Sequence, residues 1–338
     1  MPKKPHRHLT FQELLEKQQK RQEEAERYAD GVKPSMKRRS QLNDYYARHF
    51  YMITMAVDGR RSLLGTLTGD PEQPLGNPQA PQLVPSPLGD AVTRCFHDIS
   101  TYYPETYPFM LQLMPDHIHF LLLVKRDTDV HLGSIIKGFK VGCTKAFRAL
   151  TGEEGSLFET GYNDKIVTAF GKLEAFKRYL NDNPRRAIMK RQNPDFFRVR
   201  RDITIERYTL SGLGNHFLLQ RPLKARVQLS RRLEAKDIEA EVQRFMALAE
   251  GGTVLVSPGI SPAEKAVLRA AYERHLPVIS ILTNGFGEFA KPGGAFFDAC
   301  AEGRMLFLSP WEHHNEKRKI KREECLYLND IAAAVCRF

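Results

Sequence analysis

Phe109-Met-Leu-Gln-Leu-Met-Pro-Asp-His-Ile-His-Phe-Leu-Leu-Leu-Val-Lys125 is the stretch that decides the fold of this chain. Its two apolar runs are separated by Pro115-Asp116, which predicts a strand, a tight turn and a second strand. Side chains alternate between the two faces of a strand, so His117 and His119 should share one face. Two neutral imidazoles on a rigid surface can form half of a divalent-metal site. Alone, the same pair is more often two histidines on a half-exposed strand.

The segments around this stretch complete an α+β pattern. The order β-α-β-β-α-β, followed by one more helix, predicts a ferredoxin-like antiparallel sheet with helices on one face and the other face free for a ligand. Residues 65–88 are rich in glycine and proline, so they are expected to be a loop insertion without regular structure. The predicted elements are strand 49–57, a helix from 88 to about 103, helix 131–150, strand 157–168, and a helix over 172–190 that should kink or restart at Pro184.

A basic face runs along the helix predicted over 131–150. Its apolar positions face a core, and its remaining positions include Lys137, Lys140, Lys145 and Arg148. Such a face suits contacts with phosphates. An ordinary solvated face explains it equally well.

The amino-acid composition of the chain changes from about Pro222 onward. Continuous apolar strands are predicted over 253–257, 277–282 and 305–308, and helices over 262–275, where Ser261 can cap the N-terminus, and 321–336. This alternation predicts a parallel, Rossmann-like α/β sheet. The expected organisation is therefore a basic N-terminal arm over 1–48, a ferredoxin-like domain over 49–200, a linker over 201–221 and a Rossmann-like domain over 222–338.

The amino-acid composition indicates which kinds of partner the chain can bind. The 338 residues contain 51 lysines and arginines against 40 aspartates and glutamates, a net charge of +11, which favours a polyanionic partner, usually nucleic acid. An inert basic surface is the alternative. No run approaches the roughly 20 apolar residues of a membrane helix. Five scattered cysteines without a Cys-x-x-Cys pair fit a reducing cytoplasm, and no export signal is evident at the N-terminus.

A nucleophile is supplied by the helix predicted after the last strand. Tyr179 and Asn183 are four residues apart, so both should project from one face of that helix. The Asn183 amide can then point at a metal beside the Tyr179 phenol. A phenolate can attack a phosphodiester to give a covalent phosphotyrosine and a free 3′-hydroxyl. Taken singly, Tyr179 is one half-buried tyrosine and Asn183 a helix cap before Pro184.

Residues 49 to about 190 closely resemble the single-tyrosine transposases of the HUH class, IS200-like and especially the REP-associated branch. The likeness is carried by Met114-Pro-Asp-His117-Ile-His119-Phe-Leu-Leu and by Tyr179-x-x-x-Asn183-Pro184-x-Arg186-Ala187. The resemblance implies Mg²⁺ or Mn²⁺ held by His117, His119 and Asn183, where many relatives have glutamine. It implies Tyr179 as the nucleophile and Arg186 as a DNA contact.

The same resemblance implies a partner and a setting. The expected substrate is single-stranded DNA beside a hairpin, cleaved and joined in DNA transposition, in a bacterial cytoplasm and associated with the nucleoid. Some relatives work as dimers with swapped tyrosine helices, so a homodimer and a helix in cis or in trans both stay open. The end of the chain, Ser309-Pro-Trp311 to Val335, weakly resembles the DNA-processing protein A group, without that group's glycine-rich and arginine motif.

Two other functions compete with this reading. One is a transposase-derived protein that binds single-stranded nucleic acid on an RRM-like sheet without catalysis. The other is an enzyme that binds a nucleotide in the C-terminal domain, where Gly259 and Asn284 follow predicted strands.

Overall fold

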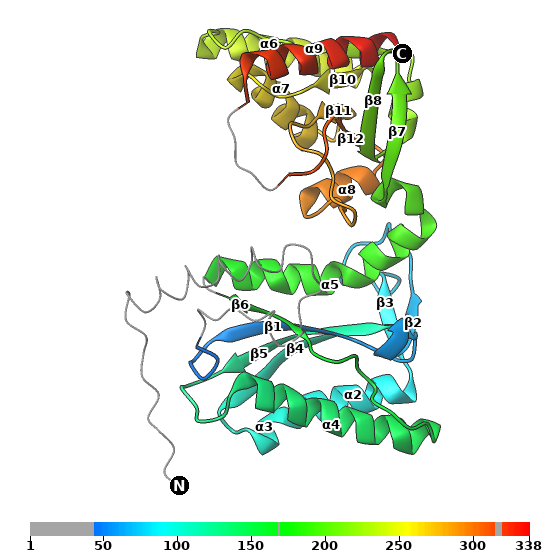
Figure 1. The fold of residues 1–338 in the computed structure, drawn as a ribbon, viewed down its shortest axis with the longest axis vertical. Helices are drawn as coiled ribbons and strands as arrows, with labels where there is room; N and C mark the ends of the chain where they lie inside the picture. Colours follow the sequence, from blue (N-terminus) through cyan, green and yellow to red (C-terminus); the bar gives the residue numbers. More distant parts are fainter. Residues whose placement is uncertain (1–43, 168–169, 315–319) are drawn as a thin grey trace. The chain divides into compact units, whose positions relative to one another are not determined.

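The computed structural model describes residues 44–167, 170–314 and 320–338 and divides the chain into two compact units, Met1–Ile188 and Met189–Phe338 (Figure 1). Most of the predicted N-terminal arm, residues 1–43, lies outside the described residues. Within the described residues, no helix is both long enough and apolar enough to cross a membrane.

The first unit is built on a four-stranded antiparallel sheet in the order β4-β5-β1-β6. Together with the helices between the strands, this gives the predicted β-α-β-β-α-β order. The elements are β1 (Phe50–Ala56), the 3-10 turn η2 (Asp58–Arg60), α2 (Pro87–His97), α3 (Ile99–Tyr102), β4 (Thr106–Met114), β5 (His117–Val124), α4 (Leu132–Thr151) and β6 (Asn163–Val167).

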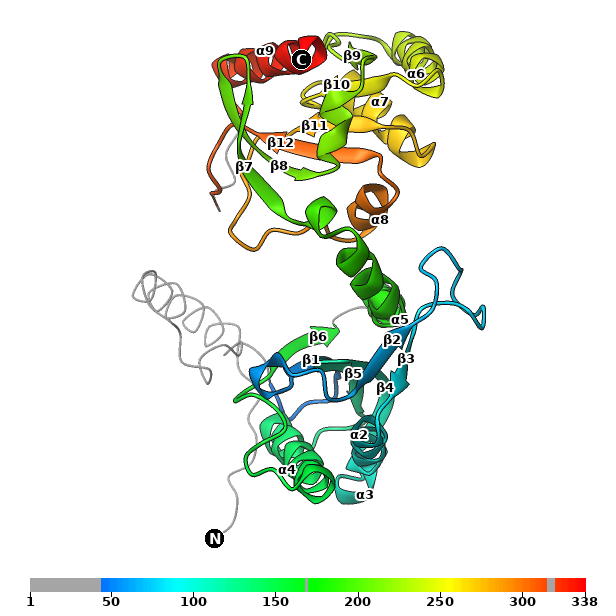
Figure 2. The same cartoon turned by 90° about the vertical axis from the view of Figure 1, so that its right-hand side faces the viewer.

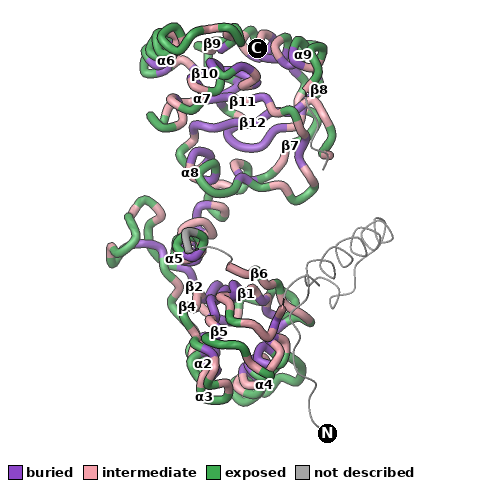
Figure 3. The backbone as a smooth tube through the Cα atoms, turned by 90° about the vertical axis from the view of Figure 1, so that its left-hand side faces the viewer, coloured by how far each residue is buried: buried purple, intermediate pink, exposed green. Residues whose placement is uncertain are grey.

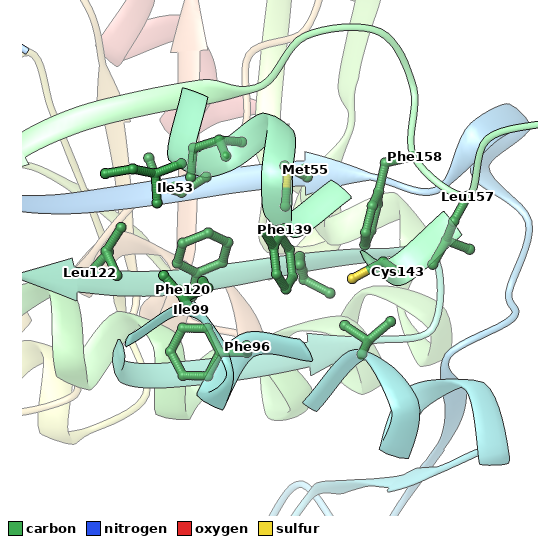
Figure 4. Close-up of a cluster of buried hydrophobic side chains, with 14 of the residues drawn as sticks. Ile53, Met55, Phe96, Ile99, Phe120, Leu122, Phe139, Cys143, Leu157 and Phe158 are labelled. Carbon is green, nitrogen blue, oxygen red and sulfur yellow. The ribbon is translucent and has the colours of Figure 1, made fainter. Parts of the chain in front are cut away.

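Alternation along the strands separates two faces of this sheet. Ile53 and Met55 of β1 and Phe120 and Leu122 of β5 are fully or almost fully buried against α2 and α4 (Figure 4). This face holds the main core of the unit, to which the helices contribute Val92, Phe96, Ile135, Ile136, Phe139, Cys143 and Phe147. The intervening residues of β1 and β5, including both histidines, therefore point to the opposite face.

The opposite face is covered by α5 (Phe170–Gln192), the helix that carries Tyr179 (Figure 1). Leu173 and Leu180 pack on Met52 and Leu121. The prediction that this face would be free for a ligand holds only in part, because the tyrosine helix of the same chain buries its apolar part and leaves a pocket beside His119.

Helix α5 runs through Pro184 without the predicted restart. A proline in a helix removes a hydrogen bond and crowds the preceding turn. Contacts on both sides hold the helix across this defect, since Leu180 packs on Leu121, and Ile188 packs with Met114 and Leu67.

Residues 65–88 do contain regular structure, contrary to the sequence prediction. Strands β2 (Gly65–Thr68) and β3 (Gln82–Pro85) form an antiparallel hairpin (Figure 2). Gly65 has φ +150°, and a Cβ there would lie 2.3 Å from the Val84 carbonyl oxygen, so the pairing needs glycine at this position. Leu67 and Leu83 give the hairpin an apolar anchor near Met114.

The second unit has a six-stranded mixed sheet in the order β7-β8-β12-β11-β10-β9. Strands β9 to β12 are parallel, whereas β8 is antiparallel to both β7 and β12. The predicted strands β10, β11 and β12 are parallel as expected, but the Rossmann-like assignment is not confirmed because the sheet as a whole is mixed. The strands are β7 (Val199–Ile205), β8 (Tyr208–Gly214), β9 (Lys224–Arg226), β10 (Val254–Ser257), β11 (Val278–Ile281) and β12 (Met305–Ser309).

The segment 201–221 is not a linker, because it holds β8 and most of β7. Its alternating residues Ile205, Tyr208 and Leu210 are buried in the sheet core. The remaining elements of the second unit are η3 (Pro194–Phe197), η4 (His216–Gln220), α6 (Ala235–Glu250), α7 (Pro262–Glu273), α8 (Ala295–Ala301) and α9 (Arg322–Arg337).

Buried residues of the second unit concentrate in β10, β11 and β12 (Figure 3). One side of the sheet packs on α6, α7 and α8, and the other on α9. Trp311, the only tryptophan of the chain, follows β12 and packs against this second core, with its ring 6.1 Å from that of Tyr327.

Candidate active site

His117 and His119 lie side by side on the α5 face of the sheet, as their spacing predicts. Their ring centroids are 4.9 Å apart and the rings are nearly perpendicular. The turn before them is fixed by two backbone hydrogen bonds, from Val57 N to the Asp116 carbonyl (2.8 Å) and from Leu64 N to the Pro115 carbonyl (3.0 Å). The pair is therefore held on a rigid strand whose start is anchored to its neighbours.

Each imidazole has a polar partner at Nδ1. His117 Nδ1 lies 2.6 Å from Asp116 Oδ1, and His119 Nδ1 lies 2.7 Å from Thr54 Oγ1 on the adjacent strand. When Nδ1–H donates to these oxygens, the Nε2 lone pair of each ring is left for a ligand. This is the usual arrangement of histidines that bind a metal, in which the second nitrogen is fixed by a hydrogen bond.

The electrostatics keep His119 neutral. Its side chain is 7% exposed, and burial lowers its pKa to about 3, with His117 and Arg60 acting in the same direction. At Asp116, burial would raise the pKa of the carboxyl group. The hydrogen bond and charge of His117, together with Arg60, outweigh it and lower that pKa, so Asp116 is an anionic acceptor. A neutral imidazole is the form that binds a cation.

Helix α5 brings Tyr179 to this pair. The Tyr179 and His119 ring centroids are 5.8 Å apart, edge to face, and Tyr179 stays 41% exposed. Asn183 lies one turn further along α5 and is 8% exposed. Its Nδ2 is buried without a hydrogen-bond partner among the described residues.

Asn183 is compatible with a metal ligand on this observation. A side-chain amide turned by 180° exchanges nitrogen and oxygen, so the unsatisfied position can hold a ligand oxygen. An asparagine oxygen and two imidazole Nε2 atoms are donor types that suit a divalent cation, so the predicted set of His117, His119 and Asn183 is chemically consistent. The described part of the chain contains no group of three or more His, Cys, Asp or Glu side chains that could hold a metal ion, so metal binding here stays a prediction.

A pocket of about 490 Å³ opens between the sheet and α5 beside His119 and Tyr179. Neither His117 nor Asn183 lines it, but Lys165 of β6 and Lys172 of α5 do. Sequence reasoning missed both lysines. Alternation on β6 was an available signal for one of them, because Lys165 pairs with Met52 and shares its face. The pocket is lined by Met52, Thr54, His119, Asn163, Lys165, Lys172, Ala175, Phe176 and Tyr179.

The basic face of α4 lies on the other side of the sheet, away from the histidines. Lys137, Lys140, Lys145 and Arg148 line a separate groove of about 850 Å³. Burial lowers the pKa of Lys140, whose Nζ donates to the carbonyls of Glu159 (2.5 Å) and Gly161 (3.1 Å). Arg148 Nε donates to the carbonyl of Gly155 (2.9 Å). Two of these four cations therefore also hold the loop before β6.

Arg186 is positioned within α5 by an ion pair. Its Nε lies 2.5 Å from Asp182 Oδ2, and Arg185 pairs with the same carboxylate. The Arg186 side chain is only 14% exposed. The structure thus gives Arg186 an intramolecular partner, and its contact with DNA stays a prediction.

In the second unit, the loop after β10 is the most plausible place to bind an anion, but its backbone N–H groups are already hydrogen-bonded to a carboxylate. After β10, the buried carboxylate of Glu264 accepts hydrogen bonds from the backbone N–H of Leu229, Ile260 and Ser261. In a phosphate-binding loop, such N–H groups would face the ligand. After the next strand, the side-chain amide of Asn284 donates to the His314 carbonyl and accepts from the His314 backbone N–H. Neither position favours the nucleotide-binding alternative.

Comparison with known proteins gives weak likenesses to this chain. No protein-family model matches it. An uncharacterised protein of Haemophilus influenzae is 21% identical over 178 residues, which are 47% of this chain and 92% of that protein.

Three solved structures are similar to parts of the chain. A putative transposase of Deinococcus radiodurans has a TM-score of 0.27 and 16% identity, covering 41% of this chain and 94% of its own. A REP-associated tyrosine transposase bound to a REP hairpin has a TM-score of 0.30 and 15% identity, covering 43% and 73%. DNA processing protein A of Helicobacter pylori has a TM-score of 0.31 and 18% identity, covering 42% and 67%. At such values, the function has to be argued from the residues of the chain itself.

Proposed function

We propose that this protein cleaves single-stranded DNA and transfers the cut strand through a covalent bond to Tyr179. The observation that carries the proposal is the Tyr179 ring 5.8 Å from His119, at a pocket that two lysines also line. A phenol, a fixed neutral imidazole and basic side chains are the groups that phosphodiester cleavage by a tyrosine needs.

The cleavage step follows from these positions. The Tyr179 oxygen attacks the phosphorus, the bond from phosphorus to the 3′ oxygen breaks, and the phenolic proton passes through solvent to the leaving 3′ oxygen, which becomes a free 3′-hydroxyl. A Mg²⁺ or Mn²⁺ ion held by His117, His119 and Asn183 would polarise the phosphate. Lys165 and Lys172 supply positive charge where the phosphate enters.

The step is reversible without an added energy source. The phosphotyrosine keeps the energy of the broken ester, so a 3′-hydroxyl from another strand can attack it and release Tyr179. Strand transfer therefore needs no other covalent chemistry. The packing of Leu173 and Leu180 on the sheet of the same chain supports a tyrosine acting in cis.

The test is adduct formation with hairpin-bearing single-stranded DNA and Mn²⁺. Wild-type protein should give a covalent protein–DNA band, and Tyr179→Phe should give none while it still binds the DNA. Tyr102→Phe is the matched control, because Tyr102 is 77% exposed and lies outside the site. An adduct at wild-type level in Tyr179→Phe would show that the nucleophile is a different residue.

A binding protein without catalysis is the competing function. An RRM-like reading needs an exposed sheet surface for the bases, and α5 covers that surface. Tight binding of single strands with no adduct under any divalent ion would nevertheless favour it.

A further inference from the structure

The outer edge of the first sheet carries exposed aromatic side chains that the proposed chemistry does not use. Among the described residues, β4 is hydrogen-bonded to β5 alone, and the β2–β3 hairpin packs near its Met114 end. On β4, Tyr107 is 51% exposed and Phe109 is 37% exposed. A bulge between Pro108 and Met110 leaves Phe109 out of the strand register, and bulges commonly redirect a side chain.

These rings are held in a defined arrangement. The Phe109 centroid lies 5.4 Å from that of Phe50, at an interplanar angle of 85°, and 6.2 Å from that of Tyr107. Phe50 supports Phe109 from β1 and is itself packed against the cluster under α5. Exposed aromatic groups with a fixed orientation are typical of a binding surface rather than of a solvated one.

The aromatic edge and the pocket of Tyr179 are joined beneath α5 by a shared apolar cluster, in which Met52, Leu121 and Leu180 are buried. Phe50 and Met110 belong to the same apolar cluster as Met52 and Phe176, and the latter two line that pocket. Tyr107 pairs with Leu123, which is four residues from His119 on β5. At about 3.4 Å per residue, the aromatic row lies roughly 14 Å from His119 along the strands.

Positive charge accompanies the row. Lys177 Nζ lies 6.0 Å from the Phe109 ring centroid, while it also pairs with Glu174 at 3.0 Å. Lys165 and Lys172 line the pocket of Tyr179, where Lys165 comes from β6 at the other edge of the sheet from β4. Aromatic faces for bases together with lysines for the backbone form the usual surface for single-stranded nucleic acid.

We propose that Tyr107 and Phe109 form a stacking platform for unpaired bases of the strand whose phosphate reaches Tyr179. The identity of the ligand as a single strand rests on the proposed function. Beside Phe109, a groove of about 440 Å³ follows the β4 edge and includes the side chains of Gln82, Gln112 and Asn181. Amide groups at this place can hydrogen-bond the edges of stacked bases.

Binding is measured by fluorescence anisotropy in the Tyr179→Phe background without divalent ions, so that no cleavage intervenes. One labelled hairpin carries an unpaired tail, and a second is blunt. The variant Tyr107→Leu/Phe109→Leu should bind the tailed hairpin about tenfold or more weakly, and the blunt hairpin unchanged. The matched control is Tyr102→Leu, which removes an exposed tyrosine outside the row. Equal affinities of the variant and its parent for the tailed hairpin would overturn the platform.

A second measurement does not depend on the fold of the leucine variant. 2-Aminopurine is placed at successive positions of the tail, and stacking on an aromatic ring should quench its fluorescence on binding at one or two positions. No quenching at any position would contradict the platform. Loss of a dimer in the variant, with unchanged affinity for the tailed hairpin, would instead identify this edge as a contact between two copies.

The outcomes separate the platform from the proposed function. If the wild type forms the adduct and the double variant binds the tailed hairpin as its parent does, the platform is rejected and the proposed function stands. If binding of the tailed hairpin depends on Phe109 but the wild type forms no adduct, the proposed catalysis is rejected and the platform stands.

Discussion

Thr54 is expected to act on the candidate site through its contact with His119. Its Oγ1 lies 2.7 Å from His119 Nδ1 and fixes the orientation of that ring. We expect Thr54→Val to weaken Mn²⁺ binding by roughly 10- to 100-fold, in line with the loss of other such partners. Thr54→Ser keeps the hydroxyl and should bind as the wild type does. Titration calorimetry with Mn²⁺ measures both, and equal affinity of the valine and serine variants would contradict the role.

The buried state of His119 predicts how stability depends on pH. In the unfolded chain its pKa is near 6.5, whereas in the folded protein it is about 3. Between these values the unfolded state binds more protons. The free energy of unfolding should therefore fall as the pH drops below 6.5, by up to about 1.4 kcal/mol per pH unit from this residue.

Urea denaturation followed by circular dichroism at pH 7, 6 and 5 measures this slope. His119→Gln has no imidazole and should show a shallower slope than the wild type. Identical slopes for the two proteins would mean that His119 is protonated in the folded state as readily as in the unfolded one.

The sequence correctly predicted the placement of residues whose position depends on local periodicity. The two-residue spacing placed His117 and His119 on one face, and this is confirmed. Lys165 and Lys172 were missed because their approach to Tyr179 depends on how α5 crosses the sheet. Lys137 and Lys145 were grouped with the site by their charge, although α4 lies on the opposite face.

At the scale of elements, continuous apolar runs predicted their strands even when short, while segments interrupted by glycine and proline did not. Strands β1, β10, β11 and β12 lie within a residue or two of their predicted ranges. The β2–β3 hairpin was missed because each strand has four residues among many glycines and prolines. Its pairing depends on tertiary contacts of Leu67, which no local pattern reveals.

Helix α5 shows how packing overrides a local rule. Pro184 favours a break, but apolar contacts before and after it keep the helix continuous from Phe170 to Gln192. Continuity has a consequence for the site. Tyr179 and Asn183 lie on the N-terminal side of the proline in one unbroken helix, so their spacing of one turn is preserved.

At the scale of the molecule, every residue of the candidate site belongs to the first unit, which ends at Ile188. The core of that unit, around Phe120 and Phe139, is distinct from those of the second unit. We therefore expect a fragment of residues 1–192, which keeps α5 whole, to form the covalent adduct at a rate close to that of the full chain.

The adduct assay on this fragment and on the full chain checks the expectation, with circular dichroism to show that the fragment is folded. The complementary fragment 193–338 should form no adduct. A folded 1–192 fragment without adduct would place an essential group in the second unit.

Trp311 can serve as an intrinsic fluorescence probe of its surroundings in the second unit. Because this residue is the only indole in the chain and packs in the second unit, intrinsic emission excited near its absorption edge reports that unit alone. A titration that raises the fluorescence anisotropy of labelled single-stranded DNA but leaves the Trp311 emission spectrum constant would show that the DNA binds away from Trp311, as a site on the first unit requires.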